Sequence, residues 1–372
     1  MSLTVRTKNF RGLVDIEWTV PAGLSVLVGA NGAGKTTFLF LVDILRQATA
    51  RDGSLASAID AYGGARRLKY FGAAEQESVM FGASLGDVAW SIEPVPMGGG
   101  LAAHAAERLT TSGGVVFARG AGSPTFEWRG RQVKSDARTL LRRLADADLE
   151  GTFAGRGLLE MLERCCIYFD YDLAQVRGGS VDSAHVALQN HGINVFSVLR
   201  NWRDWSENHE RYAFVDESLR ECFGFYGGLD FQKGGNVVEG WIKHRTLGES
   251  FPVSHAANGW LVALLHFTAV AGANPGEVVC IDELENALHP RALLTVLELI
   301  REYAEAVGIS VVVTSQSPQV LDWFDAHPER VFVLDRRHKP GPVPLTTLRS
   351  EEWLSHFRIG RKYADGDFGV EP

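Results

Sequence analysis

Long apolar runs are missing from this sequence of 372 residues, since none reaches the roughly 18–20 residues that a membrane-spanning helix needs. The first ten residues, MSLTVRTKNF, also lack the apolar core of a secretory signal. Cysteine is scarce, with four in the chain and no C-x-x-C pair, which argues against a metal or redox site built on thiols. We therefore expect a cytoplasmic protein with no membrane partner.

Excess positive charge is also missing, because the formal net charge is −8. A protein that binds nucleic acid strongly by itself usually presents a basic face. The balance of 45% hydrophobic and 22% charged residues is that of an ordinary globular chain. The composition therefore predicts a folded protein that is a weak partner for DNA by itself.

One short segment, GANGAGKTT, fits the phosphate-loop pattern G-x-x-x-x-G-K-[ST]. A β-branched apolar run over 24–28 predicts a buried strand before it, and helical spacing over 36–48 predicts a helix after it. Glycines in such a loop turn backbone N–H groups toward an anion, and the helix N-terminus adds partial positive charge. Lys35 can reach the β- and γ-phosphates, and the Thr36 hydroxyl can ligate Mg²⁺. The candidate nucleotide-binding residues are Gly29, Ala30, Asn31, Gly32, Ala33, Gly34, Lys35, Thr36 and Thr37.

Two further segments supply candidate catalytic and metal-binding residues about 250 residues later. In GEVVCIDELENALHP, the apolar run 278–281 predicts a strand that ends at Asp282 and Glu283. Asp282 is a candidate ligand for Mg²⁺, and Glu283 is placed to polarise the attacking water. A third run, 309–313, leads to Gln316 in GISVVVTSQSP. If these strands are neighbours in a parallel sheet, Gln316 lies beside the acidic strand end, where ligands bind.

Together, GANGAGKTT, CIDELENALHP and VVVTSQSP resemble the motifs of ATP-binding-cassette-type ATPases. The chain looks most like the prokaryotic branch of OLD-like AAA-family ATPases, relatives of RecF and SMC heads. The resemblance implies ATP and Mg²⁺ as cofactors, catalytic roles for Lys35, Glu283 and Gln316, and a homodimer or higher even-numbered oligomer that closes around ATP. It also implies a DNA-related process, above all anti-phage defence.

The resemblance leaves the effector open. Relatives carry, or are encoded beside, a TOPRIM nuclease, and only about 50 residues follow position 318. We therefore expect a separate, nuclease-like effector protein, with DNA contacted through the complex. Two alternatives remain: a nucleotide-sensing scaffold with negligible hydrolysis that holds and releases an effector, and a RecF-like DNA repair ATPase.

The signature segment departs from the resembled family, which places Ser-x-Gly at a helix N-terminus. The best match is Ala257-Asn258-Gly259, before a helical pattern that we predict to begin near Trp260. Ala257 removes one hydroxyl donor to the γ-phosphate, worth about 1.5–3 kcal/mol to a charged acceptor. Asn258 or Ser254 could substitute, and Gly259 and the helix dipole remain as nucleotide-binding candidates. Alternatively, this segment is only a capped core helix.

Two single positions also bear on the resemblance. Gln316 stands where many relatives carry histidine, and an amide can hydrogen-bond a phosphate or water but cannot carry a proton. With the phosphate loop and both strand-end carboxylates intact, slow hydrolysis rather than none is implied. Arg11 is similar to an N-terminal arginine that approaches the nucleotide in the family, although a plain surface arginine explains it nearly as well.

The resemblance implies an α/β fold, a P-loop ATP-binding-cassette-like ATPase head with an antiparallel β lobe and a helical insertion. We predict the N-terminal half of the head over 1–60, the β lobe over 61–134, the insertion over 135–250 and the C-terminal half over 251–372. Within these segments, strands are expected from LKYFG (68–72) to TFEWRGRQV (125–133), and 135–226 is expected to be mainly helical. The aromatic-rich stretch 196–214 predicts either helical core or an effector surface around Trp202 and Trp205; the β lobe is the other expected docking place.

Overall fold

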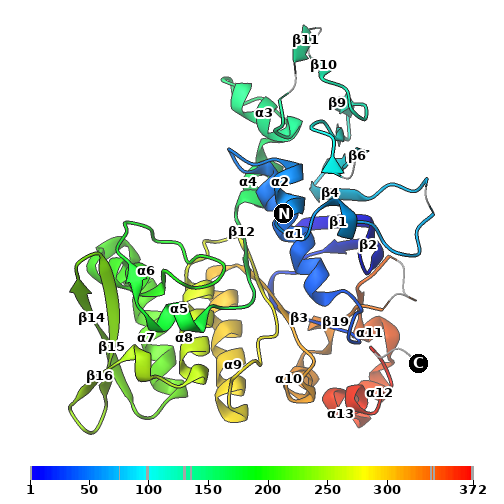
Figure 1. Ribbon diagram of the computed structural model, residues 1–372. Helices are drawn as coiled ribbons and strands as arrows, with labels where there is room; N and C mark the ends of the chain where they lie inside the picture. The colour runs from blue at the N-terminus through cyan, green and yellow to red at the C-terminus, as the bar shows by residue number, and fades with distance from the viewer. Residues whose placement is uncertain are drawn as a thin grey trace.

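The fold is built on two sheets that pack on either side of one helical layer (Figure 1). The computed structural model describes residues 2–74, 76–97, 100–128, 131–134, 136–335, 337 and 340–369. The predicted α/β fold class is confirmed: the chain has a mixed α/β fold with one largely parallel and one antiparallel sheet.

The largely parallel sheet carries the strands that the three motifs predict. Its order is β12 (Cys165–Tyr168), β17 (Val278–Ile281), β18 (Ser310–Thr314), β3 (Gly23–Val28), β19 (Val331–Val333) and β20 (Val343–Pro344). The first five strands are parallel, and β20 pairs antiparallel with β19. Because β18 stands between β17 and β3, the carboxyl ends of the three motif strands meet at one edge.

The antiparallel sheet extends away from the parallel one and forms the upper part of Figure 1. Its order is β2 (Leu13–Thr19), β1 (Leu3–Phe10), β4 (Met80–Leu85), β5 (Val88–Glu93), β8 (Ala106–Thr111) and β9 (Gly114–Arg119). Two short ribbons complete this region, β6 (Pro96–Met97) with β7 (Gly100–Leu101), and β10 (Thr125–Trp128) with β11 (Arg131–Lys134).

The parallel strands are buried on both faces, which is why they appear in the sequence as continuous apolar runs. One face, including Leu27, Cys280 and Val312, packs toward the antiparallel sheet. The helices on that side are α1 (Lys35–Thr49), α2 (Leu55–Asp60), α3 (Leu140–Ala147) and α4 (Arg156–Glu163). Alternate residues such as Val26 and Val311 face a second core.

The second core belongs to the helical side of the molecule. Its helices are α5 (Leu173–Arg177), α6 (Val195–Asp204), α7 (His209–Cys222), α8 (Asn258–Ala271) and α9 (Pro290–Val307). A small sheet covers them, with strands β13 (Ser180–Val181), β14 (Tyr226–Gly234), β15 (Val237–His244) and β16 (Ser250–Pro252). The C-terminal helices α10 (Pro318–Trp323), α11 (Leu345–Leu348), α12 (Glu351–His356) and α13 (Ile359–Ala364) lie near β3 and β19 (Figure 1).

One local prediction is wrong, one omits a short strand, and one of the two alternatives for the aromatic-rich stretch is excluded at Trp202. LKYFG is a turn region that makes only an isolated bridge between Lys69 and Phe10, because its glycine and tyrosine lie in a tight loop. The region 135–226, expected to be mainly helical, holds the helices α3 to α7 and also the short strand β12, a four-residue apolar run too short to distinguish from buried helix by pattern. Trp202 is fully buried and donates its indole N–H to the Val186 carbonyl at 2.9 Å, so it cannot form an effector surface, whereas Trp205 is 38% exposed.

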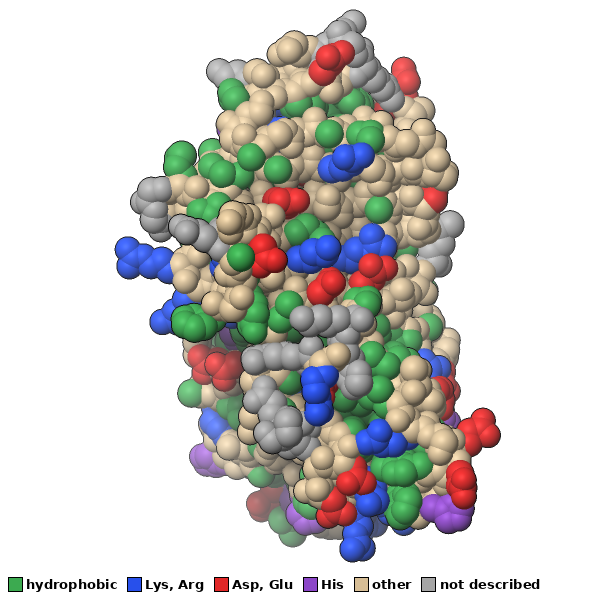
Figure 2. All heavy atoms as spheres, turned by 90° about the vertical axis from the view of Figure 1, so that its right-hand side faces the viewer, with side chains coloured by type: hydrophobic (Ala, Val, Ile, Leu, Met, Phe, Trp, Pro, Cys, Tyr) green, Lys and Arg blue, Asp and Glu red, His purple; other side chains and the backbone are tan. Residues whose placement is uncertain are grey.

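The predicted segment boundaries stay a prediction. Strands β1 and β2, from the expected N-terminal half of the head, pair with β4 of the expected β lobe. Strand β12, from the expected insertion, is an edge of the parallel sheet. Acidic and basic side chains of the described residues are interspersed on the face drawn in Figure 2.

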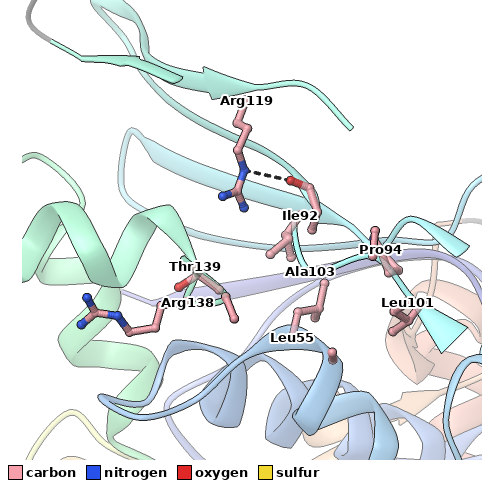
Figure 3. A pocket seen from close by; sticks show the side chains of 12 residues that line it. Leu55, Ile92, Pro94, Leu101, Ala103, Arg119, Arg138 and Thr139 are labelled. Carbon is pink, nitrogen blue, oxygen red and sulfur yellow. Dashed lines mark hydrogen bonds between the residues drawn. The ribbon is translucent and has the colours of Figure 1, made fainter. Parts of the chain in front are cut away.

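A buried carboxylate, Glu107 of β8, joins the antiparallel sheet to α3. It accepts hydrogen bonds from the Leu140 and Leu141 amides at 2.7 and 2.9 Å and from the Trp90 indole at 2.9 Å. Arg119, directly opposite on β9, pairs with it at 3.2 Å. Figure 3 shows Arg119 pointing into the small pocket beside this joint, where its Nε donates to the Ala105 carbonyl. Burial raises the pKa of Glu107, while these donors oppose the shift.

Replacing Glu107 with alanine should lower the free energy of unfolding by about 3–5 kcal/mol, because it removes the buried carboxylate that pairs with Arg119 and leaves the Leu140 and Leu141 amides and the Trp90 indole without their acceptor. The matched control is Glu17→Ala, since Glu17 also faces an arginine, Arg6, across two antiparallel strands but is 49% exposed. Glu17→Ala should lower the free energy of unfolding by less than about 1 kcal/mol. Urea denaturation measures both, and equal losses would contradict the structural role of Glu107.

Candidate nucleotide site

The phosphate loop connects the end of β3 to the start of α1, as the motif predicts. Gly32 and Gly34 adopt φ values of 80° and 109°, a region that favours glycine. A side chain at Gly34 would lie 2.5 Å from Leu13, and one at Gly29 would collide with the Leu334 carbonyl. The loop therefore requires glycine at 29 and 34 for packing as well as for backbone conformation.

The other predicted loop residues lie around this turn. Asn31 and Gly32 are exposed at its tip, Ala33 is buried, and Thr37 is half-buried in the first turn of α1. The exposed tip and the N-terminus of α1 are the geometry that backbone N–H groups need to meet an anion.

Lys35 is folded back over its own loop. Its Nζ donates to the Gly29 carbonyl at 2.7 Å and to the Ala30 carbonyl at 3.1 Å. Burial lowers the pKa of its ammonium, and three nearby carboxylates oppose this shift. They belong to Asp282, Glu283 and Glu285. The lysine is thus held beside the acidic strand end, where a triphosphate would offer further acceptors.

Thr36 and Asp282 meet although they are 246 positions apart. The Thr36 hydroxyl donates to one Asp282 carboxylate oxygen at 2.9 Å, and the Thr314 hydroxyl donates to the other at 2.5 Å. Burial raises the pKa of Asp282, and these two hydrogen bonds act in the opposite direction. A hydroxyl and a carboxylate side by side are suitable Mg²⁺ ligands, because this ion takes few protein oxygens and completes its shell with phosphate and water.

Glu283 follows in a left-handed backbone conformation, with φ of 46°. Its amide donates to the Thr314 hydroxyl at 2.8 Å. One carboxylate oxygen accepts from the Gln316 amide at 3.3 Å and the other from the Asn286 amide at 2.7 Å. Gln316 therefore lies beside the acidic strand end, as parallel order predicts. Strained backbone of this kind is common where a side chain must be aimed at a ligand.

The signature-like segment lies on the helical side. Helix α8 begins at Asn258 rather than near Trp260, and Ala257 is its N-cap without a side-chain hydrogen bond. Asn258 is exposed and accepts a hydrogen bond from Arg177 at 2.6 Å. A side chain at Gly259 would lie 2.8 Å from the Ala287 carbonyl. Gly259 thus packs against the loop after Glu283 of its own chain, and its described contacts do not include the phosphate loop.

Arg11 also lies apart from the loop in its described contacts. Its guanidinium stacks on Phe10 and Phe40 at 5.6 and 5.4 Å and donates to the Tyr62 carbonyl. Burial and the neighbouring Arg67 lower its pKa. These contacts position Arg11 along α1, so its nucleotide role stays a prediction.

Four residues of this region were missed by the sequence analysis: Thr314, Glu285, His266 and Tyr363. Thr314 was visible as the first polar residue after a strand. Glu285 accepts from the Gln316 backbone amide at 2.9 Å, and its other oxygen is buried without a hydrogen-bond partner among the described residues. Tyr363 donates to the Gly29 carbonyl at 3.0 Å across 334 positions, a contact with no sequence signal.

His266 supports the acidic loop from within α8. Its Nε2 lies 3.2 Å from the Leu284 carbonyl and its Nδ1 lies 3.3 Å from the Tyr171 hydroxyl. A carbonyl can only accept, so Nε2 carries the proton and Nδ1 accepts from Tyr171. Burial lowers the pKa of His266 to about 4, and the histidine is therefore neutral at pH 7.

Comparisons with known proteins give one family match. Residues 166–322 match the model described as "AAA domain, putative AbiEii toxin, Type IV TA system". This match includes the acidic strand end and Gln316, covers less than half of the chain, and does not include the phosphate loop. A search of curated proteins gave no match.

Solved structures similar to the chain include three SMC heads. The SMC head bound to the C-winged helix domain of ScpA is 13% identical, with a TM-score of 0.43 over 84% of this chain and 89% of that one. The Pyrococcus furiosus head with an extended coiled coil, bound to the C-terminal domain of ScpA, is 12% identical, with a TM-score of 0.43 over 88% and 92%. The Thermotoga maritima head is 15% identical, with a TM-score of 0.38 over 87% and 92%.

Two searches of the described residues concern other classes of site. None of the described helices is both long enough and apolar enough to cross a membrane. Within the same residues, no group of three or more His, Cys, Asp or Glu side chains could hold a metal ion. A metal bound here by Thr36 and Asp282 would therefore depend on phosphate oxygens and water for its remaining ligands.

The buried His266 predicts a specific pH dependence of stability. Because its folded pKa of about 4 lies below the usual 6.5, its contribution is complete above pH 6.5 and is lost as the pH falls toward 4. Between pH 7 and 5 this amounts to about 2 kcal/mol. His266→Gln keeps a hydrogen-bond donor and an acceptor but does not titrate. The loss of unfolding free energy between pH 7 and 5 should therefore be about 2 kcal/mol smaller in this variant than in the wild type.

Denaturant midpoints at pH 7, 6 and 5 measure this difference. His209→Gln, at an exposed histidine, is the matched control and should leave the pH dependence of the wild type unchanged. If His266→Gln loses as much stability between pH 7 and 5 as the wild type does, His266 is not held neutral in the folded state.

Proposed function

We propose that this protein binds ATP with Mg²⁺ at the loop Gly29–Thr37 and hydrolyses it slowly, as two copies close around the nucleotide. The observation that carries the proposal is the contact between Thr36 and Asp282, which joins the phosphate loop to the acidic strand end. A chance phosphate-loop pattern would not bring a carboxylate and a candidate general base to the same sheet edge.

Each group has a chemical task in this proposal. Backbone amides of the loop and the α1 N-terminus bind phosphate oxygens, and Lys35 neutralises charge on the β- and γ-phosphates. Thr36 and Asp282 hold Mg²⁺, which stabilises negative charge on the transferred group when bound. Glu283 accepts a hydrogen bond from the attacking water and orients it. Gln316 aims the Glu283 carboxylate through the hydrogen bond described above.

Slow turnover is expected from three features. Both Glu283 oxygens already accept amide hydrogen bonds, from Gln316 and Asn286, so an attacking water has to compete with these donors for the carboxylate. Gln316 cannot carry a proton. Ala257 offers no hydroxyl to a partner's γ-phosphate. The same features favour the second candidate, a scaffold that binds ATP without significant hydrolysis, and single-turnover hydrolysis discriminates between the two.

The dimer proposal rests on the exposed start of α8. Ala257 and Asn258 are exposed, and the helix has no side-chain cap at its N-terminus. Free N–H groups and the helix dipole at such an end attract anions. A second copy would present its γ-phosphate to this end, which gives a homodimer or a higher even-numbered assembly.

We further propose a cytoplasmic role in anti-phage defence or a related DNA process, with a separate nuclease-like effector. The description of the matching family model, which names a putative AbiEii toxin, supports a defence or toxin role. The net charge of −8 favours contact with DNA through a partner rather than directly. Phage-resistance assays of the chain alone and with its genomic neighbours test this proposal: protection only with a neighbour is expected, protection by the chain alone would contradict the separate effector, and no protection in either case would contradict the anti-phage role.

Glu283→Gln should retain ATP binding and lower single-turnover hydrolysis by about 100-fold or more, because the amide cannot accept the proton of the attacking water. Lys35→Ala should instead abolish binding, since it removes the ammonium that lies among the loop carbonyls and that would face the β- and γ-phosphates. Calorimetry and phosphate release separate the two effects. A Glu283→Gln protein that hydrolyses ATP at the wild-type rate would show that another residue is the base.

The signature can be tested at Ala257, because Gly259 is packed within its own chain. Ala257→Ser should raise ATP-driven dimerisation or turnover by up to about tenfold through one added charge-assisted hydrogen bond. Ala257→Glu should prevent ATP-driven dimerisation by charge repulsion, without harming α8, since acidic residues suit helix N-termini.

The matched control is Asn208→Glu at the start of α7, another N-cap without a side-chain hydrogen bond. It should leave dimerisation unchanged in light scattering. Normal dimerisation of Ala257→Glu with ATP would place the contact with the partner elsewhere.

A further inference from the structure

The C-terminal segment 359–369 is packed directly on the phosphate loop. The Tyr363 hydroxyl of α13 donates to the Gly29 carbonyl at 3.0 Å. Gly369 lies against the same place, because a side chain built there would be 3.4 Å from the Gly29 Cα and 3.0 Å from the Tyr363 ring. Gly369 has a φ of 68°, so its conformation also favours glycine. This segment therefore forms one wall of the loop.

Several contacts make this wall a defined structure. Phe368 is 5% exposed, and its ring lies 5.6 Å from that of Tyr363 and 6.2 Å from that of Trp353. The Lys362 ammonium pairs with the Asp367 carboxylate at 2.9 Å. The ring of Tyr363 thus packs against the buried Phe368, and the segment that carries both residues is closed by an ion pair.

The same helix also contacts the segment that follows Gln316. Gly360 packs so closely on the Pro318 carbonyl that a side chain there would collide with it. The amides of Gly360 and Ile359 donate to carboxylates on and after α10, those of Asp322 at 2.9 Å and Asp325 at 2.8 Å. Because α10 begins two residues after Gln316, α13 bridges the two sides of the candidate site.

The Gly29 carbonyl has two donors, Tyr363 and Lys35, and the Ala30 carbonyl accepts from the Ala33 amide as well as from Lys35. An ammonium has three N–H groups, of which two are engaged here. Contact with both the β- and γ-phosphates requires two of these N–H groups. The lysine must therefore break its hydrogen bond to at least one of the two carbonyls. Tyr363 would keep the Gly29 carbonyl hydrogen-bonded when that happens, and an unpaired buried carbonyl is costly.

We propose that Tyr363 is a positioning residue for the phosphate loop: its hydroxyl fixes the Gly29 carbonyl while Lys35 turns to the phosphates, and α13 ties the loop to the segment after Gln316. The proposal rests on the proposed ATP binding. It assigns the C-terminal segment a role in nucleotide affinity that its sequence does not reveal.

Tyr363→Phe keeps the ring packing and removes only the hydroxyl. Its dissociation constant for a non-hydrolysable ATP analogue with Mg²⁺ should rise about 3- to 10-fold, the range of one lost hydrogen bond. The matched control is Tyr212→Phe, because the Tyr212 hydroxyl also donates to a backbone carbonyl, that of Leu229 at 3.1 Å, from a half-buried position on α7. It should leave nucleotide affinity unchanged, and the two variants should unfold at similar temperatures.

A nucleotide-free readout separates this proposal from the proposed function. Without ATP, Tyr363→Phe should speed amide hydrogen exchange in residues 29–36 several-fold, whereas Tyr212→Phe should not. Gly369→Ala should also speed amide exchange in residues 29–36, because its methyl group would displace the Tyr363 ring. The matched control is Gly308→Ala: Gly308 also has a positive φ, 78°, but a side chain built there has no atom within 4 Å.

The outcomes are distinct. If the wild type does not bind the analogue, the proposed function fails and with it the role in affinity. If the wild type binds and Tyr363→Phe binds equally well, or if loop exchange is unchanged in Tyr363→Phe, the positioning role is overturned while the nucleotide site stands.

Discussion

The hydrogen bond between the Thr36 hydroxyl and the Asp282 carboxylate is the contact on which the site depends. It joins the first turn of α1 to the end of β17, and Thr314 at the end of β18 holds the other carboxylate oxygen. A half-buried carboxylate needs such donors, because removing it from water without partners would be costly. The three strand ends are thereby held as one unit, and the flanking groups, Lys35 and Glu283, take their positions from it.

Packing on both faces of the parallel sheet keeps these strand ends in register. Strands β17 and β18 pair so that Ile281 lies opposite Val313, and alternate residues of both strands enter different cores. A shift by one residue would exchange the two faces and turn Asp282 away from Thr36. The same packing places α8 beneath the acidic loop, where His266 donates to the Leu284 carbonyl. Site geometry is thus a consequence of core packing rather than of the motif residues alone.

The parts of the site that sequence could predict are those encoded locally. Glycines 29 and 34, the run 278–281 before Asp282 and the position of Gln316 follow from short patterns with known backbone requirements. What could not be predicted depends on contacts between distant segments: Tyr363 on Gly29, His266 on Leu284, and the addition of β12 to the parallel sheet. Trp202 was left open between core and interface, because an aromatic residue at helical spacing is more often part of a core but also occurs at interfaces.

The most direct measurement of the central claim is a crystal structure with a non-hydrolysable ATP analogue and Mn²⁺ in place of Mg²⁺. The account predicts the triphosphate against Gly29–Thr37 and an anomalous peak about 2 Å from the Thr36 hydroxyl, bound to Asp282 directly or through one water. A nucleotide bound elsewhere, or a metal that is remote from both Thr36 and Asp282, would contradict it.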